Sequence, residues 1–385
     1  MLRVALYSHD TYGLGHLRRC LKIAGALATH LDSVRGLILT GSPWAERFAP
    51  PRGFRYAKLS PVVKSGPEEY RPRDSSLSLD EVLRQRRRVL STELSLFGPD
   101  LLIVDNVPCG LRGEILQILR SFKKARKTQL VLTLRDVIDE EGVVRRQWKK
   151  SGAYEALEDL YDEVWIFGPA DAPIARSLPP MCVRKAVICG CLGTNGDSRQ
   201  TAPPPGHEAR STEPRILVTG GGGADARALI ATYVDALETI RPNAAHRLVL
   251  GPDYPDPDEL GSRDLTGLDV QVVSFDSDLP AAMREADVVV SMAGYNTVCE
   301  ALALGLRLVL VPRTWPRQEQ LLRARALAVK GRAEVVVPEE LTPARLWRAV
   351  ESALSGPRPS PSMATGGRRA AERAAHLLDD KVMVG

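Results

Sequence analysis

The stretch VALYSHDTYGLGHLRRC, residues 4–20, decides how the chain begins. Val4–Tyr7 reads as a strand buried on both faces, and Leu17–Ala28 carries apolar residues at helical spacing. Gly13 and Gly15 stand where the strand would turn into the helix. A strand, a glycine turn and a helix in this order are typical of a doubly wound α/β domain, in which ligands bind at the carboxyl ends of the strands.

The spacing of these glycines begins like the dinucleotide-binding pattern G-x-G-x-x-G, but Arg18 occupies the third glycine position. The next apolar run, Gly36–Leu39, ends without the carboxylate that would bind a nicotinamide ribose. We therefore expect no dinucleotide cofactor. Two interpretations of His16 stay open. It is a general base aimed into a cleft, because imidazole titrates near neutral pH, or a helix residue that bonds only backbone.

The composition is that of a globular protein with two domains. The chain has 385 residues, 26% of them charged and 44% hydrophobic, with a formal net charge of +5. This length favours two cores over one, and the mild charge does not indicate a nucleic-acid binder. Six cysteines without metal-ligand spacing predict neither a disulfide framework nor a zinc site. Because no apolar run suits a signal peptide or a membrane span, we expect a cytoplasmic protein.

The first part of the chain, residues 1–193, alternates short apolar runs with helical patterns, which predicts a parallel sheet covered by helices. The expected strands are Val4–Tyr7, Gly36–Leu39, Leu101–Val104, Leu130–Leu134, Val164–Phe167 and Val187–Cys189. The expected helices are Leu17–Ala28, Leu79–Phe97, Arg112–Arg126 and Gly152–Leu160. Residues 55–80 look irregular and are expected to line a ligand site. Residues 194–214, rich in Pro, Ser, Thr and Gly, read as a linker.

A second alternating series occupies residues 215–360, and residues 361–385 hold a final helix from about Arg368 to Leu378. The expected strands are Arg215–Thr219, Leu248–Gly251, Val270–Ser274, Asp287–Ser291, Leu308–Val311 and Ala333–Val337. The expected helices are Ala226–Ile240, Leu279–Glu285, Thr297–Leu304, Gln318–Lys330 and Arg345–Leu354. The fold class is therefore α/β, with two tandem doubly wound domains and an active site expected in the cleft between them.

Four successive glycines, Gly220–Gly223, follow the first strand of the second series. Bare amides at such a turn approach a ligand closely, and the N-terminus of the following helix favours negative charge. The Lys-Ser/Thr of a Walker loop is missing, so a diphosphate fits better than triphosphate hydrolysis. A plain turn is the alternative interpretation.

The stretch SMAGYNTVCEALALGLRLVLVPRTWPRQEQ, residues 291–320, is the richest in candidate ligand contacts. Gly294 lies at a second strand-to-helix turn and suits another backbone contact to phosphate. Glu300 falls in an otherwise apolar helix, where a carboxylate is either an unexplained buried charge or a bidentate acceptor for a ribose diol. Arg313 ends the next strand, and Glu319 with Gln320 begins the next helix, facing the same pocket.

This stretch resembles the donor-binding motif of the MurG-type family 28 glycosyltransferases, which have the GT-B fold. The resemblance extends to their N-terminal glycine-rich loop and covers most of the chain. The chain also resembles an uncharacterised bacterial group of predicted glycosyltransferases. Their YSHDT-x-GLGH-x-RR, LRD and GYNTVCE motifs stand here in the opening loop, at Leu134–Asp136 and at Gly294–Glu300. The opening loop is also similar to that of a UDP-sugar hydrolase of pseudaminic acid synthesis, whose histidine serves catalysis.

The resemblance implies a role for each matching residue. Glu300 would bind the ribose hydroxyls, backbone near Phe275 and Asp276 would hold the base, and the C-terminal helix would pack back on the first domain. The donor sugar would contact Arg313, Glu319 and Gln320. The donor and its diphosphate are assigned to Gly13, Gly15, Gly220, Gly221, Gly222, Gly223, Gly294 and Asn296. UDP is the expected nucleotide, with dTDP and GDP left open.

The resemblance also implies an inverting, metal-independent glycosyltransferase in which His16 deprotonates the acceptor and the glycine loop stabilises the leaving diphosphate. Asp10 and Asp136 are the preferred candidates to orient His16 or the acceptor, and Asp105 ranks below them. All three are equally compatible with helix caps. A nucleotide-sugar hydrolase, in which His16 activates water, and a non-catalytic sugar-nucleotide binding protein remain alternatives.

The expected partners are a nucleotide-sugar donor and a small-molecule or lipid-linked acceptor, without nucleic acid, a cofactor or a metal. Oligomeric state is not specified by the sequence. A peripheral contact with the inner membrane face is expected if the basic residues gather on one surface. These residues are Arg18, Arg19, Arg84–Arg88, Lys149 and Lys150.

Overall fold

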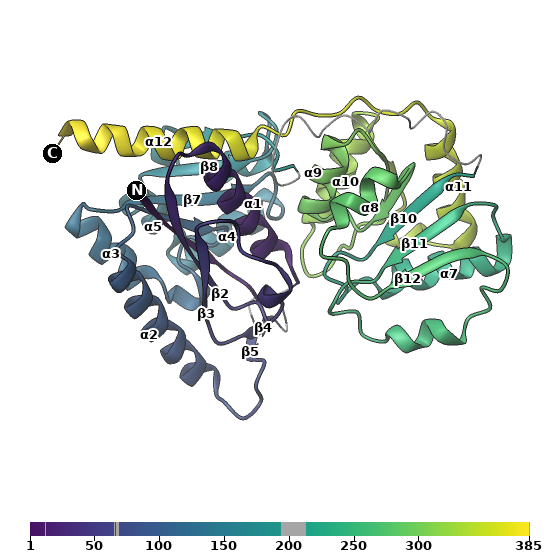
Figure 1. The fold of residues 1–385 in the computed structure, drawn as a ribbon, viewed down its shortest axis with the longest axis horizontal. Helices are drawn as coiled ribbons and strands as arrows, with labels where there is room; N and C mark the ends of the chain where they lie inside the picture. Colours follow the sequence, from purple (N-terminus) through teal and green to yellow (C-terminus); the bar gives the residue numbers. More distant parts are fainter. Residues whose placement is uncertain (12, 65, 67–68, 194–212, 385) are drawn as a thin grey trace. The chain divides into compact units, whose positions relative to one another are not determined.

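The computed structural model describes residues 1–11, 13–64, 66, 69–193 and 213–384, with side chains described as far as Asp379 (Figure 1). The chain divides into two compact units, which we describe separately. Unit 1 comprises Met1–Gly196 and Ala364–Gly385, and unit 2 comprises Asp197–Met363. The expected linker, residues 194–214, lies outside the described residues except for its last two positions.

Unit 1 is built on a seven-stranded parallel sheet with the order β3-β2-β1-β6-β7-β8-β9. Its strands are β1 (Leu2–Ser8), β2 (Val34–Thr40), β3 (Phe54–Lys58), β6 (Leu101–Asp105), β7 (Gln129–Arg135), β8 (Glu163–Phe167) and β9 (Ala186–Ile188). Every residue of β6 and β8 is buried, as expected for parallel strands covered on both faces. The strand order reverses between β1 and β6, which makes their carboxyl ends the switch point where ligands of such sheets bind.

Seven α-helices and three short 3-10 turns accompany this sheet in the described part of unit 1. The helices are α1 (Gly15–His30), α2 (Leu79–Phe97), α3 (Leu116–Ala125), α4 (Glu141–Ser151), α5 (Ala153–Asp159), α6 (Pro180–Val183) and α12 (Gly366–Val384). The 3-10 turns are η1 (Ala45–Arg47), η2 (Leu111–Gly113) and η3 (Pro173–Ser177). A capping box between Ser78 and Glu81 starts α2, and Gly98 in the left-handed conformation ends it.

The last helix, α12, belongs to unit 1 although it follows the whole of unit 2 in the sequence (Figure 1). A Cβ added to Gly367 would lie 2.8 Å from Cβ of Ala26, so α12 packs closely on α1 at this point. Arg373 forms an ion pair with Glu163 at the start of β8, and Thr365 Oγ1 donates to the carbonyl of Cys189 at 2.9 Å. These contacts fix both the start and the middle of the helix on the first sheet.

Two parts of unit 1 differ from the sequence prediction. The region 55–80 is not irregular throughout: β3 forms the edge of the sheet, and β4 (Val62–Lys64) pairs with β5 (Tyr70–Pro72) in an antiparallel hairpin. The sequence signal is weak because β3 has only two buried residues, Phe54 and Ala57. Helix α4 and the short helix α6 are additional elements. The buried residues of α4, Val144 and Trp148, stand at i, i+4 spacing.

Unit 2 has a six-stranded parallel sheet with the order β12-β11-β10-β13-β14-β15. Its strands are β10 (Arg215–Thr219), β11 (Ala245–Val249), β12 (Asp269–Val273), β13 (Val288–Ser291), β14 (Arg307–Leu310) and β15 (Glu334–Val335). Its helices are α7 (Arg227–Ile240), α8 (Leu279–Glu285), α9 (Tyr295–Ala303), α10 (Glu319–Val329) and α11 (Pro343–Ser355), with 3-10 turns η6 (Pro257–Ser262) and η7 (Pro338–Glu340). The order reverses between β10 and β13, whose last residues, Thr219 and Ser291, lie opposite each other.

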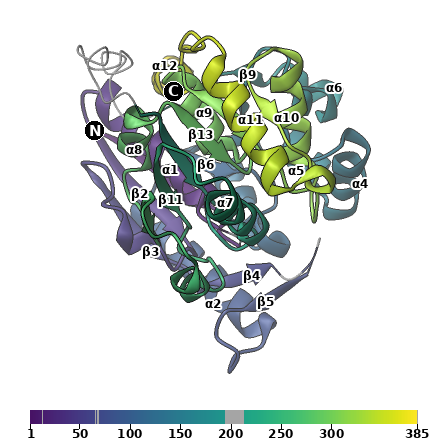
Figure 2. The same ribbon diagram turned by 90° about the vertical axis from the view of Figure 1, so that its right-hand side faces the viewer.

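Each face of this second sheet has its own apolar core. Helices α7 and α11 cover one face (Figure 2). On that face Tyr233 and Trp347 pack on strand residues such as Val218. Helices α8, α9 and α10 cover the other, through residues such as Met283 and Val298. Both units are thus the doubly wound domains that the alternating pattern predicts, and each holds its switch point at the centre of its sheet.

His246 makes the stability of unit 2 sensitive to acid. It lies in β11, with its Nδ1 2.9 Å from the hydroxyl oxygen of Tyr233, and burial lowers its pKa from 6.5 to about 4. Between these values the unfolded chain binds a proton that the folded chain does not, so stability falls as the pH drops. We expect a loss of about 2 kcal/mol in unfolding free energy between pH 7 and pH 5 from this residue.

Urea unfolding at the two pH values measures this loss. His246→Gln is expected to be less stable than the wild type at pH 7 but to lose less stability on going to pH 5. His30→Gln, at the exposed end of α1, is the matched control and should keep the wild-type slope. An equal acid slope in the wild type and His246→Gln would contradict the assignment.

Candidate functional site

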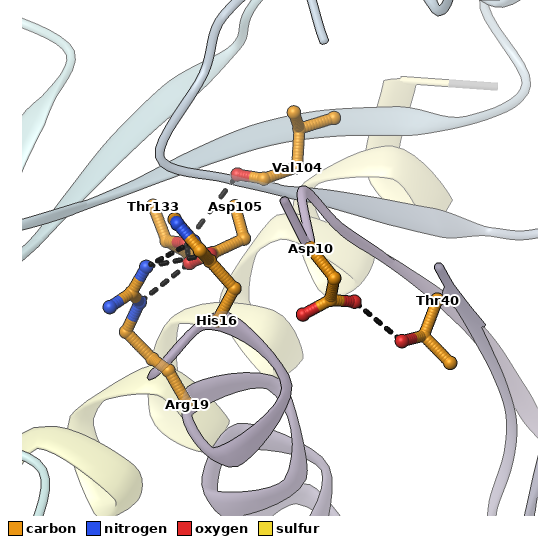
Figure 3. A network of polar contacts seen from close by, with 7 residues as sticks. All are labelled: Asp10, His16, Arg19, Thr40, Val104, Asp105 and Thr133. Atoms are coloured by element: carbon orange, nitrogen blue, oxygen red, sulfur yellow. Dashed lines mark hydrogen bonds and ion pairs between the residues drawn. The ribbon is translucent and has the colours of Figure 1, made fainter. Parts of the chain in front are cut away.

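The switch point of unit 1 holds a histidine–carboxylate pair (Figure 3). His16 is the second residue of α1, and Asp105 is the last residue of β6. Their contact joins His16 Nδ1 to Asp105 Oδ2 at 2.6 Å. Asp105 is fully buried, whereas 15% of the His16 side chain is exposed. The turn before α1 thus places the imidazole at the carboxyl end of the sheet, with one edge reaching solvent.

Asp105 is an ionised acceptor that fixes the tautomer of His16. Burial raises the pKa of Asp105, but the charge of Arg19 and the hydrogen bond with His16 outweigh it and hold the pKa well below its ordinary range. Thr133 Oγ1 also donates to Asp105 Oδ1, at 3.1 Å. Because an ionised carboxylate only accepts, His16 Nδ1 carries the proton of the contact. The lone pair of the neutral imidazole is then on Nε2, the nitrogen that a general base uses.

The sequence ranking of the carboxylates around His16 was wrong. Asp10 accepts a hydrogen bond from Thr40 Oγ1 at 2.5 Å, to one side of the His16 pair (Figure 3). Asp136 accepts from the backbone N–H of Val137 at 2.8 Å, within its own turn. Asp105 was ranked last because the sequence shows that it ends a strand but does not show which strands are neighbours in the sheet. The pairing of β1 with β6 is what brings it to His16.

Asp10 is nevertheless part of the same electrostatic environment. Its side chain is buried, and burial raises its pKa, although Thr40 and His16 act in the opposite direction. Asp10 remains a candidate to contact an acceptor in unit 1, but its bond to Thr40 gives it no direct role in orienting His16.

Two arginines of the expected basic surface are buried in the structure. Arg19 is 1% exposed and binds Asp105, and Arg86 is fully buried. Arg86 Nε and Nη2 both donate to Glu114 at 2.7 Å, and Tyr7 donates to the same carboxylate at 2.5 Å. These two arginines therefore cannot face a lipid surface. The pattern of residues along a helix does not distinguish a buried arginine, paired with a carboxylate distant in sequence, from a solvated arginine.

The glycine loop of unit 2 follows β10, and its glycines serve two different purposes. A Cβ on Gly220 would lie 2.4 Å from the carbonyl oxygen of Leu250, and one on Gly223 would lie 2.7 Å from the amide nitrogen of Tyr254. These positions need glycine because the loop packs on a neighbouring turn. At Gly221 and Gly294, nothing lies within 4 Å of an added Cβ. Their open Cα positions leave room for a ligand to approach the backbone.

Gly251 belongs to the same arrangement and was missed by sequence reasoning. It has a φ of 100° and approaches the glycine loop so closely that a Cβ would lie 2.6 Å from the carbonyl carbon of Gly222. The amide of Asp253 donates to the carbonyl of Gly222 at 2.9 Å. The turn after β11 therefore buttresses the glycine loop. A lone glycine at the end of a strand is too common a signal to reveal this.

A buried arginine shapes the turn before α9. Gly294 caps the helix in an extended conformation, with a φ of −62°, after Ala293 at a φ of 62°. Arg323, a residue of α10, donates through Nη1 to the carbonyl of Ala293 at 2.8 Å. This hydrogen bond supports the uncommon backbone conformation of Ala293. Glu300 lies fully buried on the following turn of α9, and Asn296 is 7% exposed. Sequence reasoning singled out Glu300 and Asn296 but not Arg323.

The residues expected at the donor sugar form one ion-paired cluster in unit 2. Arg313 lies 3.1 Å from Asp225 Oδ2, through Nη1, and 2.9 Å from Glu319 Oε1, through Nη2. Its backbone N–H donates to Gln320 Oε1 at 3.0 Å. Asp225, at the end of the glycine loop, is an addition to the expected set. The cluster thus links the glycine loop to the start of α10.

Phe275 follows β12 and is half-buried. Its neighbour Asp276 is anchored by Arg247, whose Nη2 donates to Asp276 Oδ2 at 2.8 Å. In the described part of the chain, no group of three or more His, Cys, Asp or Glu side chains is arranged to hold a metal ion. Among the described helices, none has both the length and the apolar character needed to span a bilayer.

The site residues therefore fall into two sets. The His16 set lies in unit 1, and the glycine loop, Glu300 and the Arg313 cluster lie in unit 2, each at the switch point of its own sheet. Two Rossmann-like domains of this kind make up the GT-B fold of glycosyltransferases. Residues 215–378 match the family model described as "Glycosyltransferase family 28 C-terminal domain".

Curated relatives of the chain are named as glycosyltransferases. The chain is 32% identical over 220 residues to a Rhodopseudomonas palustris (strain BisA53) protein, named UDP-N-acetylglucosamine--N-acetylmuramyl-(pentapeptide) pyrophosphoryl-undecaprenol N-acetylglucosamine transferase. The match covers 53% of this chain and 59% of that protein. A Nitrobacter winogradskyi protein of the same name is 30% identical over 54% of this chain and 60% of its own. The chain thus spans about three fifths of these relatives' length.

Solved structures show the same fold over nearly the whole chain. The glycotransferase of kitacinnamycin superimposes with a TM-score of 0.61 at 18% identity, covering 98% of both chains. MurG of Acinetobacter baumannii gives a TM-score of 0.57 at 14% identity, covering 99% of this chain and 100% of that one. At these identities the comparison establishes the fold, and the prediction of a GT-B architecture is confirmed.

Proposed function

We propose that this chain is an inverting glycosyltransferase that transfers a sugar from a nucleoside diphosphate to a small-molecule or lipid-linked acceptor. The observation that carries the proposal is the His16–Asp105 pair. It holds Nδ1 of His16 at the switch point of unit 1 and leaves Nε2 as the nitrogen that Asp105 does not bind, in a chain whose residues 215–378 match the family 28 C-terminal domain. The pair supplies the base that acceptor activation needs, and the curated relatives are named as transferases of this class.

The donor is proposed to bind to unit 2. Gly221, Gly222 and Gly294 would contact the diphosphate at the N-termini of α7 and α9, where the helix dipoles favour negative charge. Glu300 would accept the two ribose hydroxyls, and backbone beside Phe275 would hold the base. The remaining contacts follow the same assignment: Asn296 at the diphosphate, and Arg313, Glu319 and Gln320 at the sugar.

Transfer then proceeds as one displacement. The acceptor hydroxyl gives its proton to His16 Nε2 while its oxygen forms a bond to the anomeric carbon, and the bond from that carbon to the diphosphate oxygen breaks. Attack opposite the leaving group inverts the anomeric centre. The amides of the glycine loop and the helix dipole stabilise the charge that develops on the diphosphate. This route uses no metal ion, and Gly13 and Gly15 form the turn that presents His16.

A panel of nucleotide sugars tests the donor assignment. UDP-, dTDP- and GDP-sugars are added separately to the full chain, and the melting temperature is measured. A ligand that binds only the folded state raises this temperature. We expect one nucleotide class to stabilise the protein and the matching free nucleotide to do so less. No shift with any donor at millimolar concentration would contradict the proposal.

Gly294→Ala is expected to weaken donor binding without unfolding the protein. The backbone conformation accepts alanine, and its methyl group would meet no atom of the chain within 4 Å. The methyl would instead occupy the space that the diphosphate uses. We expect Kd for the donor to rise about 10- to 100-fold, because the contact is worth about 1.4–3 kcal/mol. The unfolding free energy should change by less than about 1 kcal/mol.

Calorimetric titration with the donor, combined with urea unfolding, checks both numbers. Gly261→Ala is the matched control, because an added Cβ there also meets nothing within 4 Å. Gly261 lies in η6, away from the glycine loop in sequence. Equal donor affinity in Gly294→Ala and Gly261→Ala would remove Gly294 from the diphosphate site.

A further inference from the structure

Arg19 holds a fixed positive charge against the imidazole of His16. It lies one turn further along α1 and is 1% exposed. Its Nε donates to Asp105 Oδ1 and its Nη2 to Asp105 Oδ2, both at 2.6 Å. The same Nη2 lies 3.1 Å from His16 Nδ1. Asp105 Oδ2 is therefore shared between a guanidinium and an imidazole that nearly touch each other (Figure 3).

The groups that face His16 come from three elements. Asp105 on β6 attracts a proton to the imidazole, and Arg19 on α1 repels it. His9, on the turn between β1 and α1, presents its ring at 5.8 Å in an edge-on arrangement. Asp10 on the same turn attracts a proton when it is ionised, and burial opposes that ionisation by raising its pKa. Asp105 and Arg19 lie 2.6 and 3.1 Å from His16 Nδ1, and their charges have opposite signs.

A buried carboxylate that no other charge opposes shifts a neighbouring histidine toward its protonated form. The carboxylate stabilises the imidazolium form, in which both ring nitrogens carry protons and neither accepts another. A guanidinium bound bidentately to the carboxylate removes most of this attraction. It also holds the carboxylate in one orientation, because the planar fork fixes both oxygens.

We propose that Arg19 is a positioning residue that cancels the pull of Asp105 on the proton and thereby keeps His16 a neutral base with its lone pair on Nε2. The charge balance at His16 does not depend on the identity of the substrate. The catalytic consequence rests on the proposed function, in which Nε2 accepts the proton of the acceptor.

The titration of His16 in the full chain tests the charge balance without any substrate. The imidazole C–H resonance of His16 is assigned by its loss in His16→Gln and followed by NMR from pH 5 to pH 9. Arg19→Gln keeps a hydrogen-bond donor but removes the charge, and it should move the midpoint upward by about one pH unit or more. Arg19→Lys keeps the charge and should leave the midpoint within a few tenths of the wild type.

The double variant Arg19→Gln/Asp105→Asn removes both charges and keeps a hydrogen-bonded pair of similar size. Its midpoint should equal that of the wild type if the two charges cancel. This comparison also decides the matter if Arg19→Gln does not fold. A midpoint in the double variant well below the wild-type value would show that Asp105 acts on His16 unopposed, and would overturn the proposal. An unchanged midpoint in folded Arg19→Gln would do the same.

The catalytic consequence is read from the pH dependence of kcat/KM for the donor that the protein uses. The acid limb of the profile should move upward in Arg19→Gln in parallel with the NMR midpoint, and Arg19→Lys should lower the rate without moving that limb. An NMR shift without a shift of the acid limb would keep the charge balance but contradict His16 as the base. The failure of the proposed function is thus distinguishable from the failure of this inference.

Discussion

Replacing His16 with alanine is expected to lower kcat for sugar transfer by about 10²- to 10⁴-fold, the usual contribution of a positioned general base. The reason lies in the pair with Asp105, which holds Nδ1 as the donor and leaves Nε2 to accept the acceptor's proton. Donor binding should remain within about twofold of the wild type, because the residues proposed to bind the donor lie in unit 2. Steady-state kinetics and calorimetric titration of the same preparation measure the two quantities.

His30→Ala is the matched control for this substitution. His30 ends the same helix, is exposed, and should be replaceable without a change in kcat. If His16→Ala keeps full turnover, another group accepts the proton and the role of His16 is structural. If it loses donor affinity as severely as turnover, the assignment of the two substrates to two units is wrong.

Asp105→Ala is expected to destabilise unit 1 by about 3–5 kcal/mol, the cost of breaking a buried ion pair by removing one partner. The substitution leaves the guanidinium of Arg19 buried without the carboxylate that binds both its Nε and its Nη2. It also removes one of the two acceptors of Thr133 Oγ1, the other being the carbonyl of Val104. Urea unfolding followed by tryptophan fluorescence measures the loss.

Asp100→Ala gives the contrast. Asp100 directly precedes β6 and pairs with Arg3, but both side chains are partly exposed, at 29% and 48%. A pair of this kind contributes about 1 kcal/mol or less. If Asp105→Ala and Asp100→Ala lose similar amounts of unfolding free energy, burial does not make the contacts of Asp105 more stabilising than those of an exposed pair. Asp105→Asn should recover part of the stability, because the amide oxygen still accepts from Arg19, but not the orientation of His16.

The sequence predicts the architecture well because parallel strands buried on both faces are continuous apolar runs. Leu101–Val104 in the first domain and Asp287–Ser291 in the second are examples, and both are central strands. An edge strand such as β3 buries only Phe54 and Ala57, so its pattern is lost among polar residues. Hydrophobic periodicity therefore identifies the central strands of each sheet but not an edge strand such as β3.

Local sequence likewise revealed some residues of the candidate site and not others. His16, Gly294 and Glu300 were found because a turn or a helix makes each of them conspicuous in its local sequence. The partner of His16 was ranked wrongly, and Arg19 was taken for a surface charge. Both errors concern contacts between elements distant in sequence, since Asp105 reaches His16 only through the pairing of β1 with β6. Local spacing carries no information about such a pairing.

The fate of the sugar from a labelled donor tests the central claim most directly. The full chain is incubated with the nucleotide sugar that raises its melting temperature most, with and without a bacterial extract of lipid-linked and small-molecule acceptors. We predict that the label enters a larger product only with the extract, with one nucleoside diphosphate released per sugar transferred and with loss of both in His16→Ala. Stoichiometric release of free sugar without any acceptor, at the same rate, would contradict a transferase.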